Sequence, residues 1–411
     1  MDRSCTRLFF LCFLLSVSSF AAAQNFNVRD YGGIGDGKAK ETAAIQKAVD
    51  ACTAAGGGTV IVPAGKWISG SIYLKNNVDF YIQAGALILG SPDKEDYNAV
   101  DVCPQNYASI KESTAGAHLF LAIEQSNITL RGPGKIDGNG LIFTCDKNGK
   151  PYRTKPYQPF PWRPAQMLYF VESQNIRIQD LQLVNAPYWT CFLHGCNHVF
   201  IRGLDIRNNR RPLVWEGDGI DIDSSQYVVV SDCMIDVDDD AITLRANPKR
   251  LKKKQDCKYI TVSNCILSGG CDGIRIGVGD GHISNAVFSN LIIMNGHRAI
   301  DFIGAWNSES RGPDIDHIRF QNVYVNTRDL LSIRLGFGKE PKTCKFSDIS
   351  FDGFFGEVQK GIVLLGQPEN PITRISISNF SFKTGIPKSF LQSAHAKDLE
   401  VKNVKPSTVS P

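Results

Sequence analysis

The amino-acid sequence predicts an all-β protein, folded as a single-domain right-handed parallel β-helix with an N-terminal capping helix. Two observations lead to this prediction. A short strand with buried aliphatic positions recurs roughly every 20 to 30 residues along most of the chain, and an amphipathic helix precedes the first row of strands. The 37 glycines suit a chain that turns every few residues. Because each coil of a solenoid contacts only its neighbours, 411 residues can form one elongated body.

The helix is expected near the start of the chain. Ala44, Ile45, Ala48, Val49 and Cys52 recur at helical spacing, and a run of three glycines then stops the pattern. Short apolar strands follow, separated by glycine, asparagine and proline. A helix in this place would cover the open end of the solenoid, where the first coil would otherwise expose its core.

One strand of the repeat can be aligned over six coils. The aligned segments are Asp218-Gly-Ile-Asp-Ile, Asp240-Ala-Ile-Thr-Leu, Asp272-Gly-Ile-Arg-Ile, Arg298-Ala-Ile-Asp-Phe, Leu331-Ser-Ile-Arg-Leu and Lys360-Gly-Ile-Val-Leu. Positions three and five are apolar throughout, so strand alternation buries them. Position four then faces outward, and it holds Asp221, Thr243, Arg275, Asp301, Arg334 and Val363. Position one shares the parity of the core but is charged, so it must lie at the bend before the strand and line one edge of a groove.

Three carboxylates of this groove are candidate catalytic groups. Asp218, Asp239 and Asp240 are expected one or two coil steps apart, about 5 to 10 Å. Clustered carboxylates raise one another's proton affinity, so one can act as an acid while another acts as a base. Hydrolysis of a glycosidic bond requires such a pair.

At these residues the chain resembles glycoside hydrolase family 28, the polygalacturonase and related pectinase family, from about Phe26 to residue 365. The resemblance includes Trp162-Arg163-Pro164 and Ala186-Pro187-Tyr188-Trp189. The family's Asn-Thr-Asp motif matches Glu216-Gly217-Asp218, and its Gly-Asp-Asp motif matches Asp238-Asp239-Asp240. The match implies that Asp239 is the general acid, that Asp218 and Asp240 hold and deprotonate the attacking water, and that the anomeric configuration is inverted.

Two family motifs have lost their basic residues. Gly-His-Gly falls on Cys271-Asp272-Gly273, and Arg-Ile-Lys falls on Asp301-Phe302-Ile303. In polygalacturonases these groups hold the galacturonate carboxylate. Arg275 and Arg298 could replace them, or each could pair with an aspartate such as Asp272 or Asp301. The candidate substrate-binding residues are therefore Asp272, Arg275, Arg298, Asp301, Arg245 and Trp189.

A long insertion, residues 145–164, is rich in aromatic, proline and basic residues. Tyr152, Tyr157, Phe160 and Trp162 either wall one end of the groove, which would favour exo-action, or pack against the side of the solenoid.

Residues 1–23 read as a signal peptide, with Arg3 and Arg7 before an apolar stretch and three alanines before Gln24. Residues 24–411 would be the catalytic domain, secreted or periplasmic, with no membrane span and as a monomer. The net charge of +4 is too small for a nucleic-acid binder. The cysteine and histidine spacings predict no metal site, and no cofactor is expected.

Export permits disulfides, and Cys191 with Cys196 is one candidate pair. Cys233, Cys257 and Cys265 fall in strand-like runs and are expected to be buried thiols.

The function that these features favour is an inverting glycoside hydrolase acting on a pectic, acidic polysaccharide or oligosaccharide through a galacturonosyl or rhamnogalacturonan-type linkage, with exo-action as one mode. Two alternatives stay open. A β-helix polysaccharide lyase would eliminate across a uronate and create an unsaturated product. A non-catalytic carbohydrate-binding solenoid would bind the polymer without turnover.

Overall fold

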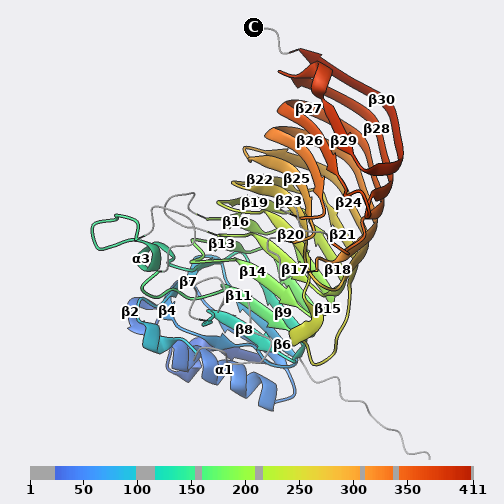
Figure 1. Ribbon diagram of the computed structural model, residues 1–411. Coiled ribbons are helices and arrows are strands. Elements are labelled where there is room, and N and C mark those ends of the chain that lie inside the picture. The colour runs from blue at the N-terminus through green and yellow to red at the C-terminus, as the bar shows by residue number, and fades with distance from the viewer. Residues whose placement is uncertain are drawn as a thin grey trace, which may run out of the picture.

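The computed structural model describes residues 24–98, 116–152, 160–208, 216–305, 311–336 and 342–408. These residues wind into stacked coils along one axis, with α1 at the N-terminal end and β30 at the other (Figure 1). Every pairing between two named strands is parallel, and each coil pairs with the next one along the chain. The predicted right-handed parallel β-helix is confirmed. The predicted signal peptide lies outside the described residues, and the single-domain division stays a prediction.

Each coil contributes strands to three parallel sheets, called here the first, second and third sheet in the order in which a coil crosses them. The first sheet consists of β5 (Ile72–Tyr73), β8 (Phe120–Ile123), β11 (Leu168–Val171), β14 (Cys191–His194), β17 (Ile220–Asp223), β20 (Ile242–Ala246), β23 (Asp272–Gly279), β25 (Arg298–Ile303), the end of β26 (Asp314–Arg334), the end of β27 (Ser347–Leu365) and β29 (Leu391–Ala394).

The second and third sheets complete the coil. The second consists of β1 (Asn25–Asn27), β3 (Gly58–Val62), β6 (Val78–Ile82), β9 (Ser126–Arg131), β12 (Gln174–Gln179), β15 (Asn197–Arg202), β18 (Gln226–Ser231), β21 (Cys257–Ser263) and the first parts of β24 (His282–Met294), β26, β27, β28 (Ile372–Thr384) and β30 (Ala396–Thr408). The third consists of β2 (Asp36–Lys40), β4 (Gly65–Ser69), β7 (Ala86–Gly90), β10 (Lys135–Asp137), β13 (Gln182–Val184), β16 (Asp205–Arg207), β19 (Met234–Val237), β22 (Ile266–Gly269) and later parts of β24, β26, β27, β28 and β30.

Strand alternation builds one core along the axis. The inward residues of all three sheets form a single hydrophobic cluster that extends from Phe26 near one end to Phe390 near the other. Phenylalanine rings stack from coil to coil inside it, as in Phe288, Phe320 and Phe351, whose centroids lie 4.4 and 5.3 Å apart. Such stacking stabilises neighbouring coils in register.

An asparagine in the left-handed conformation recurs where the chain passes from the first to the second sheet. Asn77, Asn127 and Asn175 have φ values of 61°, 59° and 55°. Asparagine tolerates this conformation better than most residues, and here it also bonds along the stack. Asn127 donates to Asn77 at 2.8 Å, and Asn175 donates to Asn127 at 3.0 Å.

The predicted capping helix is confirmed as α1 (Thr42–Ala54). Its buried face holds Ile45, Val49 and Cys52 against the first coils, and three glycines with positive φ follow its end. The other helical elements of the described residues are short: η1 (Val28–Tyr31), η2 (Lys94–Asp96), α3 (Leu141–Thr144), η3 (Pro248–Arg250) and η4 (Pro387–Ser389). Among the described residues, no helix has the length and apolar character needed to cross a bilayer.

One coil of the predicted alignment is wrong by two residues. Asp301 pairs with Ser332 and Arg298 pairs with Asp329, so Asp329 holds position one and Ser332 holds position four, not Leu331 and Arg334. A shift of two residues keeps the strand parity, and Leu331 and Ile333 are both aliphatic. Alternation therefore cannot distinguish the two registers.

The predicted Cys191–Cys196 disulfide is wrong. All described cysteines are free thiols, and both of these are buried. Cys191 lies in β14, while the Cys196 thiol donates to the carbonyl of Phe170 at 3.3 Å in the adjacent coil. The expected buried thiols Cys233, Cys257 and Cys265 are confirmed.

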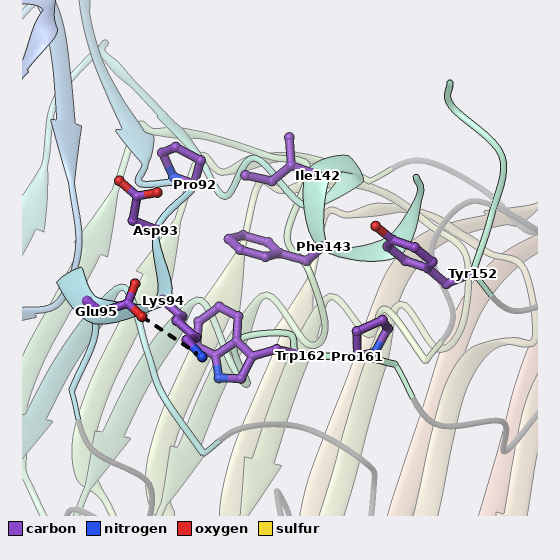
Figure 2. A pocket seen from close by; sticks show the side chains of 9 residues that line it. All are labelled: Pro92, Asp93, Lys94, Glu95, Ile142, Phe143, Tyr152, Pro161 and Trp162. Carbon is purple, nitrogen blue, oxygen red and sulfur yellow. Dashed lines mark ion pairs between the residues drawn. The ribbon is translucent and has the colours of Figure 1, made fainter. Parts of the chain in front are cut away.

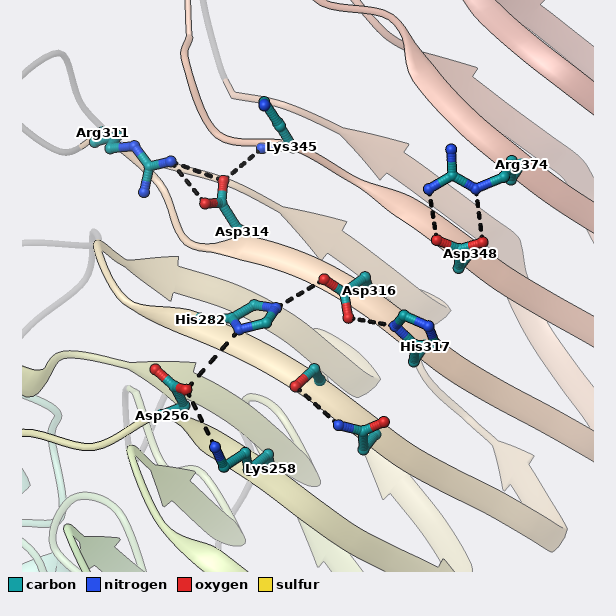
Figure 3. A network of polar contacts seen from close by, with 12 residues as sticks. Asp256, Lys258, His282, Arg311, Asp314, Asp316, His317, Lys345, Asp348 and Arg374 are labelled. Atoms are coloured by element: carbon teal, nitrogen blue, oxygen red, sulfur yellow. Dashed lines mark hydrogen bonds and ion pairs between the residues drawn. The ribbon is translucent and has the colours of Figure 1, made fainter.

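The outer surface of the second sheet and its flanks carries exposed polar pairs (Figure 3). Arg374 binds Asp348 through two hydrogen bonds of 2.7 Å from the adjacent coil, and His282 contacts Asp316 at 2.8 Å. The charge-bearing groups of this surface are solvated, which contrasts with the buried charges on the first sheet.

Candidate active site

The predicted position-one residues gather at the bend between the third and first sheets. Asp218 and Asp240 immediately precede strands β17 and β20, which pair directly. The residue after Asp218 is Gly219, and no side chain fits there, because a Cβ would lie 2.4 Å from the carbonyl oxygen of Ala241. The small residue at position two thus lets successive coils approach closely and brings the preceding side chains together.

These side chains form a ladder that joins three coils. Asp218 Oδ1 accepts a hydrogen bond from the backbone N–H of Asp240 at 3.1 Å. Asp240 Oδ1 in turn accepts one from the N–H of Asp272 at 3.1 Å. All three side chains are buried. The carboxylates of Asp218 and Asp240 therefore also have a structural role, because each accepts a hydrogen bond from a backbone donor at the bend.

Asp239 is the more accessible of the three predicted catalytic carboxylates, since it is half-buried whereas Asp218 and Asp240 are buried. Ligand atoms of Asp239, Asp240 and Cys271 lie within 4.8 Å of one another, a spacing that could also hold a metal ion. Asp240, however, also contacts the guanidinium group of Arg275. We therefore assign these three residues to the carboxylate site.

Arg275 contacts two of the three candidate catalytic groups. It projects from position four of β23, and its Nε donates a short hydrogen bond to Asp240, while Nη2 lies 3.7 Å from Asp218. Burial disfavours the charge of Arg275, but Asp240 and Asp218 outweigh burial and raise its pKa. The guanidinium is therefore charged and directed at the carboxylate cluster.

Asp218 carries a strongly perturbed carboxyl group. Burial is the main cause, and the charges of Asp221, Asp240 and Asp239 add to it, so the pKa of Asp218 lies well above its usual value despite Arg275. Burial followed by Asp240 and Asp301 raises the pKa of Asp272 in the same way. The cluster thus retains protons in an environment where isolated aspartates would lose them.

Arg298 makes the aspartate contacts that the sequence offered as one of its two roles. Its Nη1 lies 3.1 Å from Asp272 and 2.8 Å from Asp301, and Arg334 contacts Asp301 at 3.3 Å from the following coil. Burial disfavours the Arg298 charge, yet Asp272 and Asp301 raise its pKa overall. Arg298 pairs with aspartates, and Arg275 pairs with the candidate catalytic residues themselves.

Arg245 and Trp189 lie together on the N-terminal side of the carboxylates. The guanidinium of Arg245 lies 4.4 Å from the Trp189 ring centroid and 3.6 Å from Asp221, which also accepts a 2.6 Å hydrogen bond from Thr243. A cation placed over an indole ring is a stabilising arrangement. The structure brings this pair next to Asp218, because Trp189 holds position one of the preceding coil.

The position-one column extends further than the sequence alignment recognised. The strand registers place His118, Gln166 and Trp189 in line with Asp218 and Asp240. The signal was present in the sequence, since each residue precedes a strand with apolar third and fifth positions. Aromatic rather than β-branched residues in those strands concealed the repeat.

Aromatic rings cover the outward face of these earlier coils. Tyr169 and Phe192 hold position four, with centroids 5.8 Å apart, and Phe192 lies 5.3 Å from Trp189. His118 stacks on Tyr169 at 4.1 Å. Burial lowers the pKa of His118 to about 3, so this histidine is neutral. The face of the first sheet therefore changes from aromatic to charged as it reaches Asp218.

The insertion at residues 145–164 contributes to a separate pocket of about 290 Å³ (Figure 2). Trp162, Phe143 and Tyr152 line it together with Lys94 and other residues. Trp162 packs edge-on against Phe143 at 5.3 Å. Of the other predicted aromatic residues, Phe160 is buried against Arg163, and Tyr157 lies outside the described residues.

Arg163 connects this insertion to the carboxylate site. Its Nη2 lies 2.9 Å from Glu216, two residues before Asp218, and its Nη1 donates to the carbonyl of Pro187 at 3.3 Å. The pocket and the carboxylates therefore lie on loops that precede strands of the same first sheet.

Fold and site together define a right-handed parallel β-helix protein with a buried carboxylate cluster at one bend of its coil. A model described as glycosyl hydrolases family 28 matches residues 82–408, and the chain belongs to this family. A second model, rhamnogalacturonase A/epimerase, pectate lyase-like, matches residues 25–86. The resemblance predicted from the aspartate motifs is confirmed.

Similar proteins agree with this membership. The chain is 29% identical over 231 residues to a probable polygalacturonase of Vitis vinifera, covering 54% of this chain and 45% of that protein. It is 26% identical over 284 residues to an exo-poly-alpha-D-galacturonosidase of Dickeya chrysanthemi, covering 59% and 45%. The chain thus spans about half the length of these curated relatives. An exopolygalacturonase structure from Thermotoga maritima aligns with a TM-score of 0.71 at 19% identity over 92% of each chain, which shows the fold.

Proposed function

We propose that the chain is an inverting glycoside hydrolase that acts on a pectic polysaccharide or oligosaccharide, outside the cell or in the periplasm, as a monomer. The observation that carries the proposal is the arrangement of Asp218, Asp239 and Asp240. One carboxyl is accessible, two are buried behind it, and a guanidinium contacts the buried pair. In such unequal environments chemically identical carboxyl groups differ in pKa, so that one can act as the acid and another as the base.

The proposed roles follow from access and charge. Asp239, the least buried of the three, donates a proton to the departing glycosidic oxygen. Asp240, with Asp218 beside it, holds the attacking water and accepts its proton. Because burial raises the pKa of Asp218, this carboxyl group favours its protonated form more than an ordinary aspartate does, and we assign the proton of the attacking water to Asp240. Arg275 positions Asp240 through the hydrogen bond from its Nε.

We also propose exo-action. The pocket lined by Trp162 and Tyr152 belongs to the loops on the N-terminal side of Asp218. A bulky loop at one end of a groove limits how many sugar units can extend past the cleaved bond. Relatives named exo-poly-alpha-D-galacturonosidase and exopolygalacturonase support this mode.

The test uses purified protein and a panel of pectic polymers and oligosaccharides. Release of monosaccharide alone supports exo-action, and release of mixed oligosaccharides contradicts it. Asp239→Asn should abolish turnover while substrate binding persists, because the amide cannot donate the acid proton. Asp236→Asn, on the exposed side of neighbouring strand β19, is the matched control and should retain full activity.

The two alternatives give different results in the same assay. A lyase would release a product with a double bond that absorbs in the near ultraviolet, and hydrolysis would not. A non-catalytic binding protein would bind the polymers but release nothing, and Asp239→Asn would then leave its behaviour unchanged. The retained aspartates favour hydrolysis over both.

A further inference from the structure

The charges around the candidate catalytic residues determine which sugar can bind there. Of the described residues on this part of the first sheet and in the bend before it, eight are carboxylates: Asp218, Asp221, Asp223, Asp238, Asp239, Asp240, Asp272 and Asp301. Four are guanidinium groups: Arg245, Arg275, Arg298 and Arg334. Eight against four leaves an excess of four negative charges when all are ionised.

Each of the four cations already has a carboxylate partner. Arg245 lies 3.6 Å from Asp221. Arg275 contacts Asp240, Arg298 contacts Asp272, and Arg334 contacts Asp301. A galacturonate carboxylate entering this region would compete with buried aspartates for the same guanidinium groups. It would also face, at short range, the carboxylates that are in excess of the guanidinium groups, and the protein interior screens this repulsion poorly.

The neighbouring part of the position-one column is suited to a neutral ligand. Gln166 is fully buried, and within the described residues neither its side-chain oxygen nor its side-chain nitrogen has a hydrogen-bond partner. It stands one coil before Trp189 and two before Asp218. A buried amide without partners requires an explanation, such as a group that completes it on binding. An amide donates and accepts, as sugar hydroxyls do.

We propose that the sugar unit whose glycosidic bond is cleaved is neutral, recognised through its hydroxyl groups by Gln166 beside Trp189, and that a galacturonosyl unit is rejected from this position. The proposal rests on the proposed hydrolytic function and narrows it to neutral sugars of pectic material, such as deoxyhexosyl or hexosyl units. An acidic unit can still occupy the leaving-group side of the bond.

Matched substrates that differ only in the carboxyl group provide the test. Polygalacturonate is compared with its carboxyl-reduced form, which keeps the linkage and loses the charge. Aryl α-galacturonide is compared with aryl α-galactoside and aryl α-rhamnoside. We expect kcat/KM for a neutral member to exceed that of the acidic substrates on the order of 100-fold or more, as a single unscreened repulsion would give.

The outcomes separate the two proposals. Hydrolysis of polygalacturonate or the galacturonide at a rate equal to or above every neutral substrate overturns this inference and leaves the hydrolase standing. Failure to hydrolyse any member, by protein with intact cooperative unfolding, refutes both. Preference for a neutral substrate supports both.

Two variants test the named residues. Asp301→Asn removes the carboxylate shared by Arg298 and Arg334, so the ratio of neutral to acidic kcat/KM should fall about tenfold. Asp348→Asn, whose carboxylate binds Arg374 on the exposed surface, should leave that ratio unchanged. Gln166→Leu should raise KM for the neutral substrate more than it lowers kcat. An unchanged ratio in Asp301→Asn, or an unchanged KM in Gln166→Leu, contradicts the proposed recognition.

Discussion

Replacement of Arg275 by methionine should destabilise the protein strongly, and in a way that depends on pH. The guanidinium and its two partners are nearly inaccessible, with side-chain exposures of 5% for Arg275, 6% for Asp240 and 3% for Asp218. Methionine keeps most of the buried stem and removes the charge. Because a buried ion pair that loses one partner leaves the other uncompensated, we expect a loss of about 3–5 kcal/mol in unfolding free energy near neutral pH.

The loss should shrink as the pH falls. As Asp218, whose pKa is raised, takes up a proton, one buried negative charge fewer needs a partner, so the cost of losing Arg275 falls towards that of altered packing, about 1 kcal/mol. Equilibrium urea unfolding, monitored by tryptophan fluorescence at about pH 7.5 and about pH 4, measures both values. Reversibility is checked by refolding from high urea.

Arg374→Met is the matched control, because Arg374 also makes a two-bond contact with an aspartate but is 56% exposed. An exposed pair contributes only about 0–1 kcal/mol. The reasoning is refuted if Arg275→Met costs no more than this control at neutral pH, or if its cost is the same at both pH values.

Three further changes test the site and the fold. Burial raises the pKa of Asp218, so folded-state stability is lost as the pH rises from about 3.8 through the raised value. Asp218→Asn should therefore unfold at higher urea concentration than the parent protein at neutral pH but not near pH 3, and a gain at both pH values would contradict this. Phe320→Ala removes a ring stacked between two others and should cost about 3–5 kcal/mol in urea unfolding; a cost under 1 kcal/mol would argue against the stacked core. Gly277→Ala places a Cβ 1.8 Å from the Ile303 carbonyl oxygen at a φ of 135° and should prevent soluble expression or lower the melting temperature sharply, whereas Gly56→Ala, in open space, should lower it far less.

Much of the fold could be predicted from the sequence because its information is local and repeated. The apolar third and fifth positions of each strand, and a helix that ends at three glycines, specify coils and a cap without knowledge of distant contacts. The register of the coil at Leu331 could not be predicted, since a two-residue shift preserves every apolar position. Only the pairing of Asp301 with Ser332 decides it.

The sequence predicted which residues meet at the bend, but not which of their side chains contact one another. Asp218, Asp239, Asp240, Asp272 and Arg298 were placed at one bend from spacing alone. That Arg275 contacts Asp240 could not be predicted, because residues 35 positions apart meet only when the lengths of the intervening loops are known. Gln166 was missed for a simpler reason: its strand has aromatic and leucine residues where later coils have isoleucine.

The anomeric form of the first sugar released is the measurement that tests the central claim most directly. Proton NMR during the first minutes of hydrolysis of a reactive pectic substrate records this form before mutarotation. The account predicts the configuration opposite to that of the cleaved bond, with no unsaturated product and no turnover by Asp239→Asn. Release of the same configuration, or of a product that absorbs in the near ultraviolet, would contradict the assignment of Asp239 as acid and of Asp240 with Asp218 as the water-activating pair.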